Sequence, residues 1–405
     1  MTAGFISRIG DWLLVIALPI FVYAHTQSTL RSSVTMMIEL GATLIVGQFA
    51  GLVVDRYDRR LVMVTTNGLQ GLLLVPLLFA DSGHSLWIVY LTAGLQAALG
   101  SFAGPAENAL LPNLVSDEDL VQANSVVGVA ADLAKLIGAT AGGTALAIAG
   151  LRGVVVVDAA SFALAALLMS VRFPGATAQA PGVSPSLASP WQAWRQGLRV
   201  LRSKRTLLAA FVIVALNQLA QGIALALIVA WVVVDVHRGS ASVGAFRGAQ
   251  VIGSLPAGLL IAAYGRSWSP ERLLKISLLA GAVVEFAIWN GPAVTHWFGY
   301  YLILQVLLGF PGVAAFIAFG TIIQRETPDA FRGRVFSLVG AVAAVATLLS
   351  VLVGGWLGTR VDPRHVLNGT VALEFLNGLA AVALFRGTRG TRFKRGDQPR
   401  SEDDA

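Results

Sequence analysis

Residues 51–60 read Gly-Leu-Val-Val-Asp-Arg-Tyr-Asp-Arg-Arg, and this stretch decides the fold of the chain. Five of its last six residues are charged, and long apolar segments precede and follow it. Because so much charge cannot lie in hydrocarbon, the stretch predicts a tight loop at a membrane face. Residues 258–267 repeat its Gly, Leu, Tyr and one Arg without gaps, 207 positions later. That offset is about half the chain and indicates an internal duplication.

The composition of the chain is that of a membrane protein. Of its 405 residues, 56% are hydrophobic and 13% are charged, whereas about 25% are charged in a soluble domain. Long apolar runs favour helices over a transmembrane barrel. The sequence has no cysteine, which excludes disulfides and thiol sites. The net charge of +7 comes from basic loops and does not predict nucleic-acid binding.

The apolar runs predict an all-α polytopic protein with 12 transmembrane helices in two pseudo-symmetric six-helix bundles. About 20 apolar residues cross a bilayer. The expected spans are 3–24, 32–54, 61–80, 86–108, 123–148, 152–171, 206–234, 241–264, 272–290, 296–321, 335–358 and 366–385. The domains that follow are an N-terminal bundle, a cytoplasmic linker with a basic amphipathic helix, a C-terminal bundle and a cytoplasmic tail, at 1–172, 173–205, 206–386 and 387–405.

Two features of the loops set the expected orientation. With the N-terminus inside, 21 of the 29 Lys and Arg residues fall in cytoplasmic loops and five fall outside, which predicts cytoplasmic termini in the cell membrane. The start of the chain has no basic leader or cleavage site, so we expect no cleavable signal. In the linker, one helical face carries Trp and Leu residues and the other carries arginines, which predicts contact with lipids of the inner leaflet. These residues are Trp191, Trp194, Leu198 and Leu201, and Arg195, Arg199 and Arg202.

The sequence argues against several kinds of chemistry. No Lys is followed by Ser or Thr, so the phosphate-binding loop of ATPases is absent. The five histidines show no ligand spacing, so we expect no metal site. No catalytic set or cofactor motif is present, and we predict a transporter rather than an enzyme. Uphill movement of a solute would then need an ion gradient.

The charged loop after the second span resembles the signature loop of the major facilitator superfamily. Residues 7–12, 17–19, 111–112 and 122–124, with Pro105, resemble the branch that holds macrolide-type drug exporters and enterobactin-type siderophore exporters. Two positions depart from the family pattern. Asp58 stands where a Gly is usual, and residues 138–143 (Gly-Ala-Thr-Ala-Gly-Gly) lack the proline of the exporter motif. The small residues still predict close helix packing, with an echo at Gly354 and Gly355.

The resemblance implies a conformational latch between the two halves. The carboxylate that ends the second span would face the start of the eleventh span, where the helix dipole and arginines attract it. The alternative is a cluster that only sets membrane orientation. The latch residues are Gly51, Asp55, Arg56, Arg59, Arg60, Arg332 and Arg334. Pro311 and Gly312 should break the tenth span, and broken helices are where transporters bend and bind.

Charges within the spans are the candidate proton-coupling and substrate-cavity residues, because each costs at least roughly 2.5 kcal/mol at mid-helix. They are Asp11, Glu39, Asp132, Lys135 and Arg247. Coupling could use Glu39 or Asp11, or a cross-helix pair with Arg247 or Lys135.

Spacing offers simpler roles for some of these charges. Asp132 with Lys135, and Arg8 with Asp11, have the spacing of structural pairs. Carboxylates on the sixth, ninth and twelfth spans favour packing or pairing roles, at Asp158, Glu285 and Glu374.

The duplicated halves and the charges within the spans predict a proton-coupled secondary transporter, which we expect to be a monomer. The resemblance implies that it exports an amphipathic drug-like or siderophore-like molecule. An uptake symporter or lipid transporter of the same fold, and a transport-inactive receptor or scaffold, are the alternatives.

Overall fold

The computed structural model of the chain describes residues 2–80, 85–111, 120–170, 190–265, 268–328 and 331–385. Side chains are not described at 55, 120–122, 124–125, 190–194, 196–197 and 333. Residues 173–189 of the predicted linker, the predicted tail at 387–405 and the Asp55 side chain of the latch therefore lie outside the described residues. Within the described ranges all regular structure is helical, as predicted.

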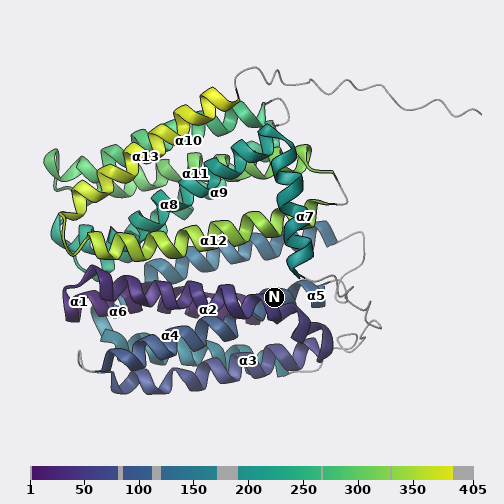
Figure 1. Cartoon of the computed structure of the whole chain (residues 1–405). Coiled ribbons are helices and arrows are strands. Elements are labelled where there is room, and N and C mark those ends of the chain that lie inside the picture. Colours follow the sequence, from purple (N-terminus) through teal and green to yellow (C-terminus); the bar gives the residue numbers. More distant parts are fainter. Residues whose placement is uncertain are drawn as a thin grey trace, which may run out of the picture.

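Two six-helix bundles lie side by side (Figure 1). The N-terminal half contains α1 (Thr2–Thr26), α2 (Thr29–Arg56), α3 (Arg59–Leu73) with η1 (Val75–Phe79), α4 (Leu86–Gly100), α5 (Ala103–Leu110) and α6 (Leu120–Ser170). The C-terminal half contains α8 (Arg205–Val234), α9 (Ser240–Tyr264), α10 (Pro270–Asn290), η6 (Gly291–Ala293), α11 (Phe298–Glu326), α12 (Arg332–Leu357) and α13 (Pro363–Leu384). Between them lies α7 (Pro190–Ser203).

The fifth and sixth predicted spans are joined into the single long helix α6. Eleven described helices are long and apolar enough to cross a membrane, and α6 supplies two crossings because it kinks at Gly150, where φ is 63° and ψ is −172°. This backbone region is essentially reserved for glycine. The twelve predicted crossings are therefore present, with one turn made by a glycine kink instead of a loop.

We name the two ends of the molecule by what lies there. The linker end holds α7, the start of α8 and the end of α13, and the hairpin end holds the turns that join α1 to α2 and α8 to α9 (Figure 1). The predicted amphipathic helix is present as α7, whose Arg195, Arg199 and Arg202 are exposed. Its Leu201 is 1% exposed and packs in the core of the C-terminal half. Contact of α7 with lipids stays a prediction.

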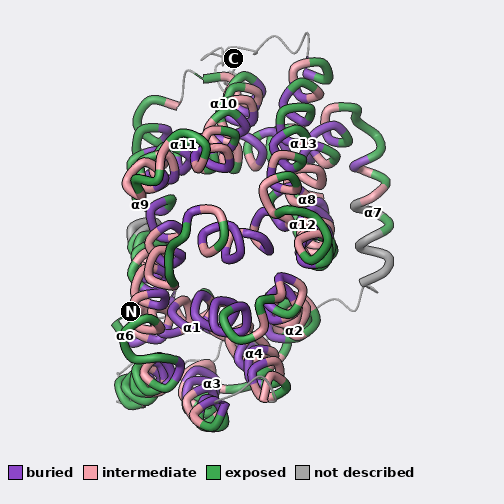
Figure 2. Tube along the Cα trace, turned by 90° about the vertical axis from the view of Figure 1, so that its left-hand side faces the viewer, coloured by how far each residue is buried: buried purple, intermediate pink, exposed green. Residues whose placement is uncertain are grey.

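The two halves meet along two pairs of helices. Viewed along the helices, α6 lies beside α9 on one side of the molecule and α2 lies beside α12 on the other (Figure 2), and both pairs are in contact. At the hairpin end, the Thr29 hydroxyl of α2 donates a hydrogen bond of 2.8 Å to the carbonyl of Gly355 on α12.

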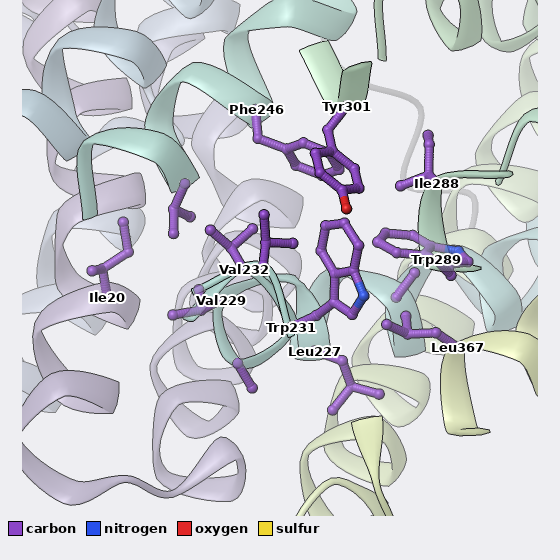
Figure 3. Packing of buried hydrophobic residues seen from close by; sticks show 14 of the residues in the cluster. Ile20, Leu227, Val229, Trp231, Val232, Phe246, Ile288, Trp289, Tyr301 and Leu367 are labelled. Carbon is purple, nitrogen blue, oxygen red and sulfur yellow. The ribbon is translucent and has the colours of Figure 1, made fainter. Parts of the chain in front are cut away.

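A cluster of aromatic and aliphatic side chains fills the hairpin end. Trp231 at its centre packs edge-on against Trp289 and Tyr301, with ring centroids 4.9 and 5.5 Å apart (Figure 3). The N-terminal half contributes Ile16, Ile20, Tyr23 and Ala139 to the same cluster. Burying large aromatic surfaces is strongly favourable, so the cluster closes this end of the interface. We call it the hairpin-end cluster.

Candidate functional site

Small residues let the helices of the two halves approach closely next to the hairpin-end cluster. A Cβ atom placed on Gly142 of α6 would lie 2.6 Å from the carbonyl oxygen of Leu13 on α1. A Cβ atom on the adjacent Gly143 would lie 2.9 Å from the backbone nitrogen of Gly244 on α9. Gly142 thus allows α6 to pack closely on α1 within the N-terminal half, and Gly143 allows α6 to pack closely on α9 between the halves. The close packing predicted for residues 138–143 is confirmed.

The same arrangement recurs in the C-terminal half. A Cβ atom on Gly354 of α12 would lie 2.8 Å from the Cα atom of Ile223 on α8, within one half. A Cβ atom on Gly355 would lie 2.6 Å from the Cβ atom of Ser33 on α2, in the other half. The two glycine pairs are 212 residues apart in the sequence. In each bundle, one glycine of the pair therefore allows close packing within the half, and the other allows close packing between the halves.

A cavity of about 530 Å³ lies between the halves, directly on the linker side of the hairpin-end cluster. Its wall is formed by α1, α2 and α4 from the N-terminal half and by α8 and α9 from the C-terminal half. Asp11 and Glu39 line it from one half and Arg247 lines it from the other. Three of the five predicted charges are therefore brought together. We call this space the central cavity.

The two carboxylates of the central cavity differ in their surroundings. Asp11 accepts a hydrogen bond of 3.4 Å from the Gln70 amide of α3. Glu39 has no hydrogen bond or ion pair of this kind among the described contacts, and Arg247 is the opposite charge that acts on it across the interface. Among the described residues, Glu39 and Arg247 form no ion pair within 4.0 Å. Glu39 and Arg247 thus lie on opposite halves of the chain in the wall of the central cavity.

The remaining predicted charges are arranged differently from the expectation. Asp132 and Lys135 do not form the expected ion pair. Asp132 is exposed, and the Lys135 ammonium lies 5.0 Å from the centre of the Trp12 ring, where the ring face attracts it. Neither residue is among those that line the central cavity.

Arg8 and Asp11 form no direct ion pair either, although the charge of Arg8 acts on Asp11 as expected. Arg8 pairs with Glu107 of α5. The ion-pair partner of Arg8 therefore comes from another span and not from its own helix.

The predicted helix break at Pro311 and Gly312 is not present. Helix α11 continues through Pro311, because membrane helices tolerate proline when neighbouring helices hold them. Here α9 packs tightly against the preceding turn, since a Cβ atom on Gly309 would lie 2.6 Å from the nitrogen of Ser254. Pro311 and Gly312 nevertheless line a second cavity.

This second cavity, of about 510 Å³, lies within the C-terminal half. All six membrane helices of that half contribute to its wall, through Gln221, Gln250, Glu285, Phe316, Val339 and Glu374. The sequence assigned Glu285 and Glu374 to packing or pairing roles. They do pair through Gln221, but their place in a cavity wall was missed, because their helices were expected to flank the bundle.

The described contacts of the latch residues lie inside their own halves. Arg59 donates to the carbonyl of Ala109 at 2.6 Å and Arg60 to that of Met169 at 2.6 Å. Arg332 donates to the carbonyl of Gln324 at 3.2 Å, and Arg334 lies 5.3 Å from the Phe331 ring. Because the Asp55 side chain is outside the described residues, the latch stays a prediction.

Solved transporter structures share this architecture. The nucleoside transporter NupG superposes with a TM-score of 0.70 at 14% identity, over 95% of this chain and 98% of that one. A bacterial homologue of the iron transporter ferroportin in an inward-facing state gives a TM-score of 0.66 at 18% identity, over 95% and 97% of the two chains. At these identities the likeness shows the fold alone.

Sequence relatives span most of the chain. The MFS-type transporter YfiS of Bacillus subtilis (strain 168) is 24% identical over 375 residues, which is 88% of this chain and 86% of YfiS. The enterobactin exporter EntS of Citrobacter koseri is 26% identical over 390 residues, 89% of this chain and 85% of EntS. The model of the Major Facilitator Superfamily matches residues 1–239 and 210–402. The chain is therefore a multi-pass membrane protein that belongs to the Major Facilitator Superfamily of transporters.

Proposed function

We propose that the protein is a proton-coupled secondary transporter that exports an amphipathic small molecule by alternating access. The observation that carries this proposal is the central cavity, in which Asp11 and Glu39 of one half face Arg247 of the other. Charges within membrane spans mark ion and substrate pathways. In this mechanism residues 1–172 and 206–386 rock against each other around the cavity.

Glu39 is proposed as the proton-coupling residue. When its carboxyl is ionised, Arg247 attracts it and holds the halves together at the level of the cavity. When the carboxyl takes up a proton, that attraction is lost and the halves can separate. Asp11 is the second candidate, but the Gln70 amide already satisfies part of its hydrogen bonding.

The basic residues of the loops support an orientation in the membrane, and the residues that line the central cavity support a class of cargo. The excess of Lys and Arg in the loops supports a cytoplasmic position for the linker end and both termini, so the hairpin-end cluster would close the outer side. Apolar wall residues such as Trp12, Leu14 and Met36 suit the apolar part of a cargo. Export agrees with the enterobactin exporters among the relatives. One chain supplies the whole cavity, which is consistent with a monomer.

Proteoliposomes with an imposed pH gradient test this function. Iron-free enterobactin and ethidium serve as probes, each followed by fluorescence, and at least one should move against its own gradient when protons flow the other way. Glu39→Gln should reduce this uphill movement at least tenfold. Glu326→Gln removes a carboxylate at the linker end, which contacts Lys204 at 3.4 Å, and should leave transport unchanged. Movement that ignores the pH gradient for both probes would contradict proton coupling.

A further inference from the structure

A cluster of one amide and two carboxylates lies in the wall of the second cavity. The side-chain amide of Gln221 on α8 donates to Oε1 of Glu285 on α10 at 2.9 Å and to Oε1 of Glu374 on α13 at 2.7 Å. The two glutamates are 3% and 4% exposed, respectively. Three helices that are distant in sequence thus converge on one polar point within an apolar bundle.

The cluster is short of hydrogen-bond donors. A glutamine amide has two N–H groups, and here both are directed at a carboxylate. Oε2 of Glu285 is buried and makes no hydrogen bond of full geometry with a described residue, although the Glu374 carboxyl and the Trp289 indole lie close enough to act on Glu285. Two adjacent carboxylates in an apolar site cannot both stay ionised without a positive group nearby. The cluster therefore needs a proton or a cation to complete it.

No side chain among the described residues supplies that positive charge. The only titratable groups in the cavity wall are Glu285 and Glu374. Arg247 of α9 lines the central cavity instead. The other charged residues on the six helices lie near helix ends, at Arg205, Glu271, Arg272, Lys275, Arg325, Glu326, Arg332, Arg334, Arg364 and His365.

The shape and chemistry of the cavity favour an organic cation over a metal ion. Its walls include Leu278, Phe316, Phe319 and Val339, and its volume of about 510 Å³ falls within the usual range of roughly 300–1,000 Å³ for ligand pockets. Hard metal ions need about six oxygen ligands. The described residues contain no group of three or more His, Cys, Asp or Glu that could hold a metal.

The N-terminal half has a related cluster on the corresponding helices. Asp11 on α1, Gln70 on α3 and Asp158 on α6 again provide two carboxylates and one amide, and Gln70 donates to Asp11 at 3.4 Å. Asp158 is buried, it lies close enough to act on Asp11, and its Oδ2 atom has no partner among the described residues. Corresponding helices of the two bundles thus carry two carboxylates and one amide, although the amide lies on α3 in the N-terminal half and on α8 in the C-terminal half. In the C-terminal copy both of its carboxylates line a cavity.

We propose that Glu285 and Glu374, bridged by Gln221, form a binding site for an organic cation whose apolar body occupies the second cavity. The cationic head lies on the cavity side of the two carboxylates and neutralises their charge. A proton on either carboxylate competes with this head, so binding weakens as the pH falls. The inference deepens the proposed transport function and rests on it for its physiological meaning, but binding itself requires no transport.

Equilibrium binding to the purified full-length protein tests the site directly. The probe is tetraphenylphosphonium, a permanent cation with an apolar body, and tetraphenylborate is its anionic match in shape. We expect saturable binding of about one cation per chain at pH 8, at least tenfold weaker binding at pH 5.5, and no saturable binding of the anion. Glu285→Gln and Glu374→Gln should each weaken cation binding at least tenfold. Glu326→Gln, the same substitution at the linker end, should not change it.

Labelling of the unmutated protein keeps the test decisive if a variant does not fold. Dicyclohexylcarbodiimide modifies protonated carboxyl groups in apolar sites, and mass spectrometry locates the modified peptides. Saturating tetraphenylphosphonium should suppress modification of the peptides that contain Glu285 and Glu374. Undiminished modification, equal binding of the anion, or unchanged affinity in the folded Gln variants would overturn the proposal. Cation binding without proton-driven transport would refute only the transport function, and transport without cation binding would refute only this site.

Discussion

Asp235 and Arg364 form an ion pair at the hairpin end that links α8 to α13. Both Nε and Nη2 of Arg364 donate to Oδ1 of Asp235, at 3.1 and 2.7 Å. The Asp235 side chain is only 6% exposed, and burial raises its pKa above the ordinary value of 3.8, while Arg364 opposes that shift. A carboxyl with a raised pKa contributes most stability when it is protonated, and this contribution is lost as the pH rises through its folded-state pKa.

The first prediction concerns this pair. Arg364→Gln should lower the free energy of unfolding by about 1–3 kcal/mol at pH 7.5, because Asp235 would be ionised and largely buried without its cation. The loss should shrink towards pH 5 as the carboxyl takes up a proton. Thermal unfolding in detergent at both pH values measures it. Adding Asp235→Asn should restore most of the stability, and Arg360→Gln at the same end is the control. A loss that does not depend on pH would contradict this account.

Charged residues within the predicted spans were the sequence feature that predicted which residues line the central cavity. Asp11, Glu39 and Arg247 could be chosen because each is costly in a membrane span, and the fold brings them together. The partners of such charges could not be chosen in the same way. Glu107 pairs with Arg8 from 99 residues away. Sequence spacing reports only neighbours on one helix, so it favoured pairs that the tertiary structure replaced.

The two glycine pairs are the element that sets how closely the halves approach. Gly143 meets Gly244 across the interface, and Gly355 meets Ser33. Nearer the linker end, a Cβ atom on Gly47 of α2 or Gly340 of α12 would have no neighbour within 4 Å among the described residues. These two glycines therefore do not limit the approach of the halves, whereas Gly143 and Gly355 do.

A methyl group at this contact should open the hairpin end. In Gly244→Ala the added Cβ would lie 2.7 Å from the Ala139 carbonyl oxygen, a backbone atom that cannot turn away. We expect a loss of about 1–3 kcal/mol of stability. We also expect faster labelling of a thiol introduced at Ile20 by a water-soluble maleimide.

The absence of natural cysteine makes the labelling specific to that thiol. Gly128→Ala is the matched control, because its Cβ would have no described neighbour within 4 Å. Equal labelling in the two variants would show that the glycine contact does not hold this end closed.

Helix boundaries were well predicted from apolar length, whereas interruptions of helices were not. Gly150 makes the sharp turn inside α6 through a positive φ, although the sequence there reads as a short loop between two spans. Pro311 lies inside α11 without ending it. The effect of a proline or glycine depends on whether a neighbouring helix holds the segment. That information comes from packing and is absent from the local sequence.

The duplicated plan of the molecule is the part that the sequence predicted best. The repeat of residues 51–60 at 258–267 indicated two equivalent halves, and the bundles, the glycine pairs and the amide–carboxylate clusters all follow it. The second cavity could not be predicted, because it needs six helices of one half to converge around side chains that look ordinary one by one.

The proposed latch between the halves gives a prediction for the whole transport cycle. Asp55→Asn should reduce proton-driven transport at least tenfold without lowering the amount of protein in the membrane, because the carboxylate would lose its attraction to Arg332 or Arg334. Transport into proteoliposomes and immunoblotting of membranes measure the two quantities. Exchange of the charges, Asp55→Arg with Arg334→Asp, should recover part of the activity. Normal transport by Asp55→Asn would refute the latch and favour a role in membrane orientation alone.

The hairpin-end cluster has a thermodynamic consequence for the cycle. In the proposed cycle, opening of this end would separate Ile16, Ile20 and Tyr23 from the aromatic side chains around Trp231 and expose them to water. Hydration of apolar surface raises the heat capacity. The free-energy difference between the closed and open forms should therefore be a curved function of temperature. The closed form should be favoured most at an intermediate temperature and should weaken on cooling, which would bend an Arrhenius plot of turnover if opening limits the rate.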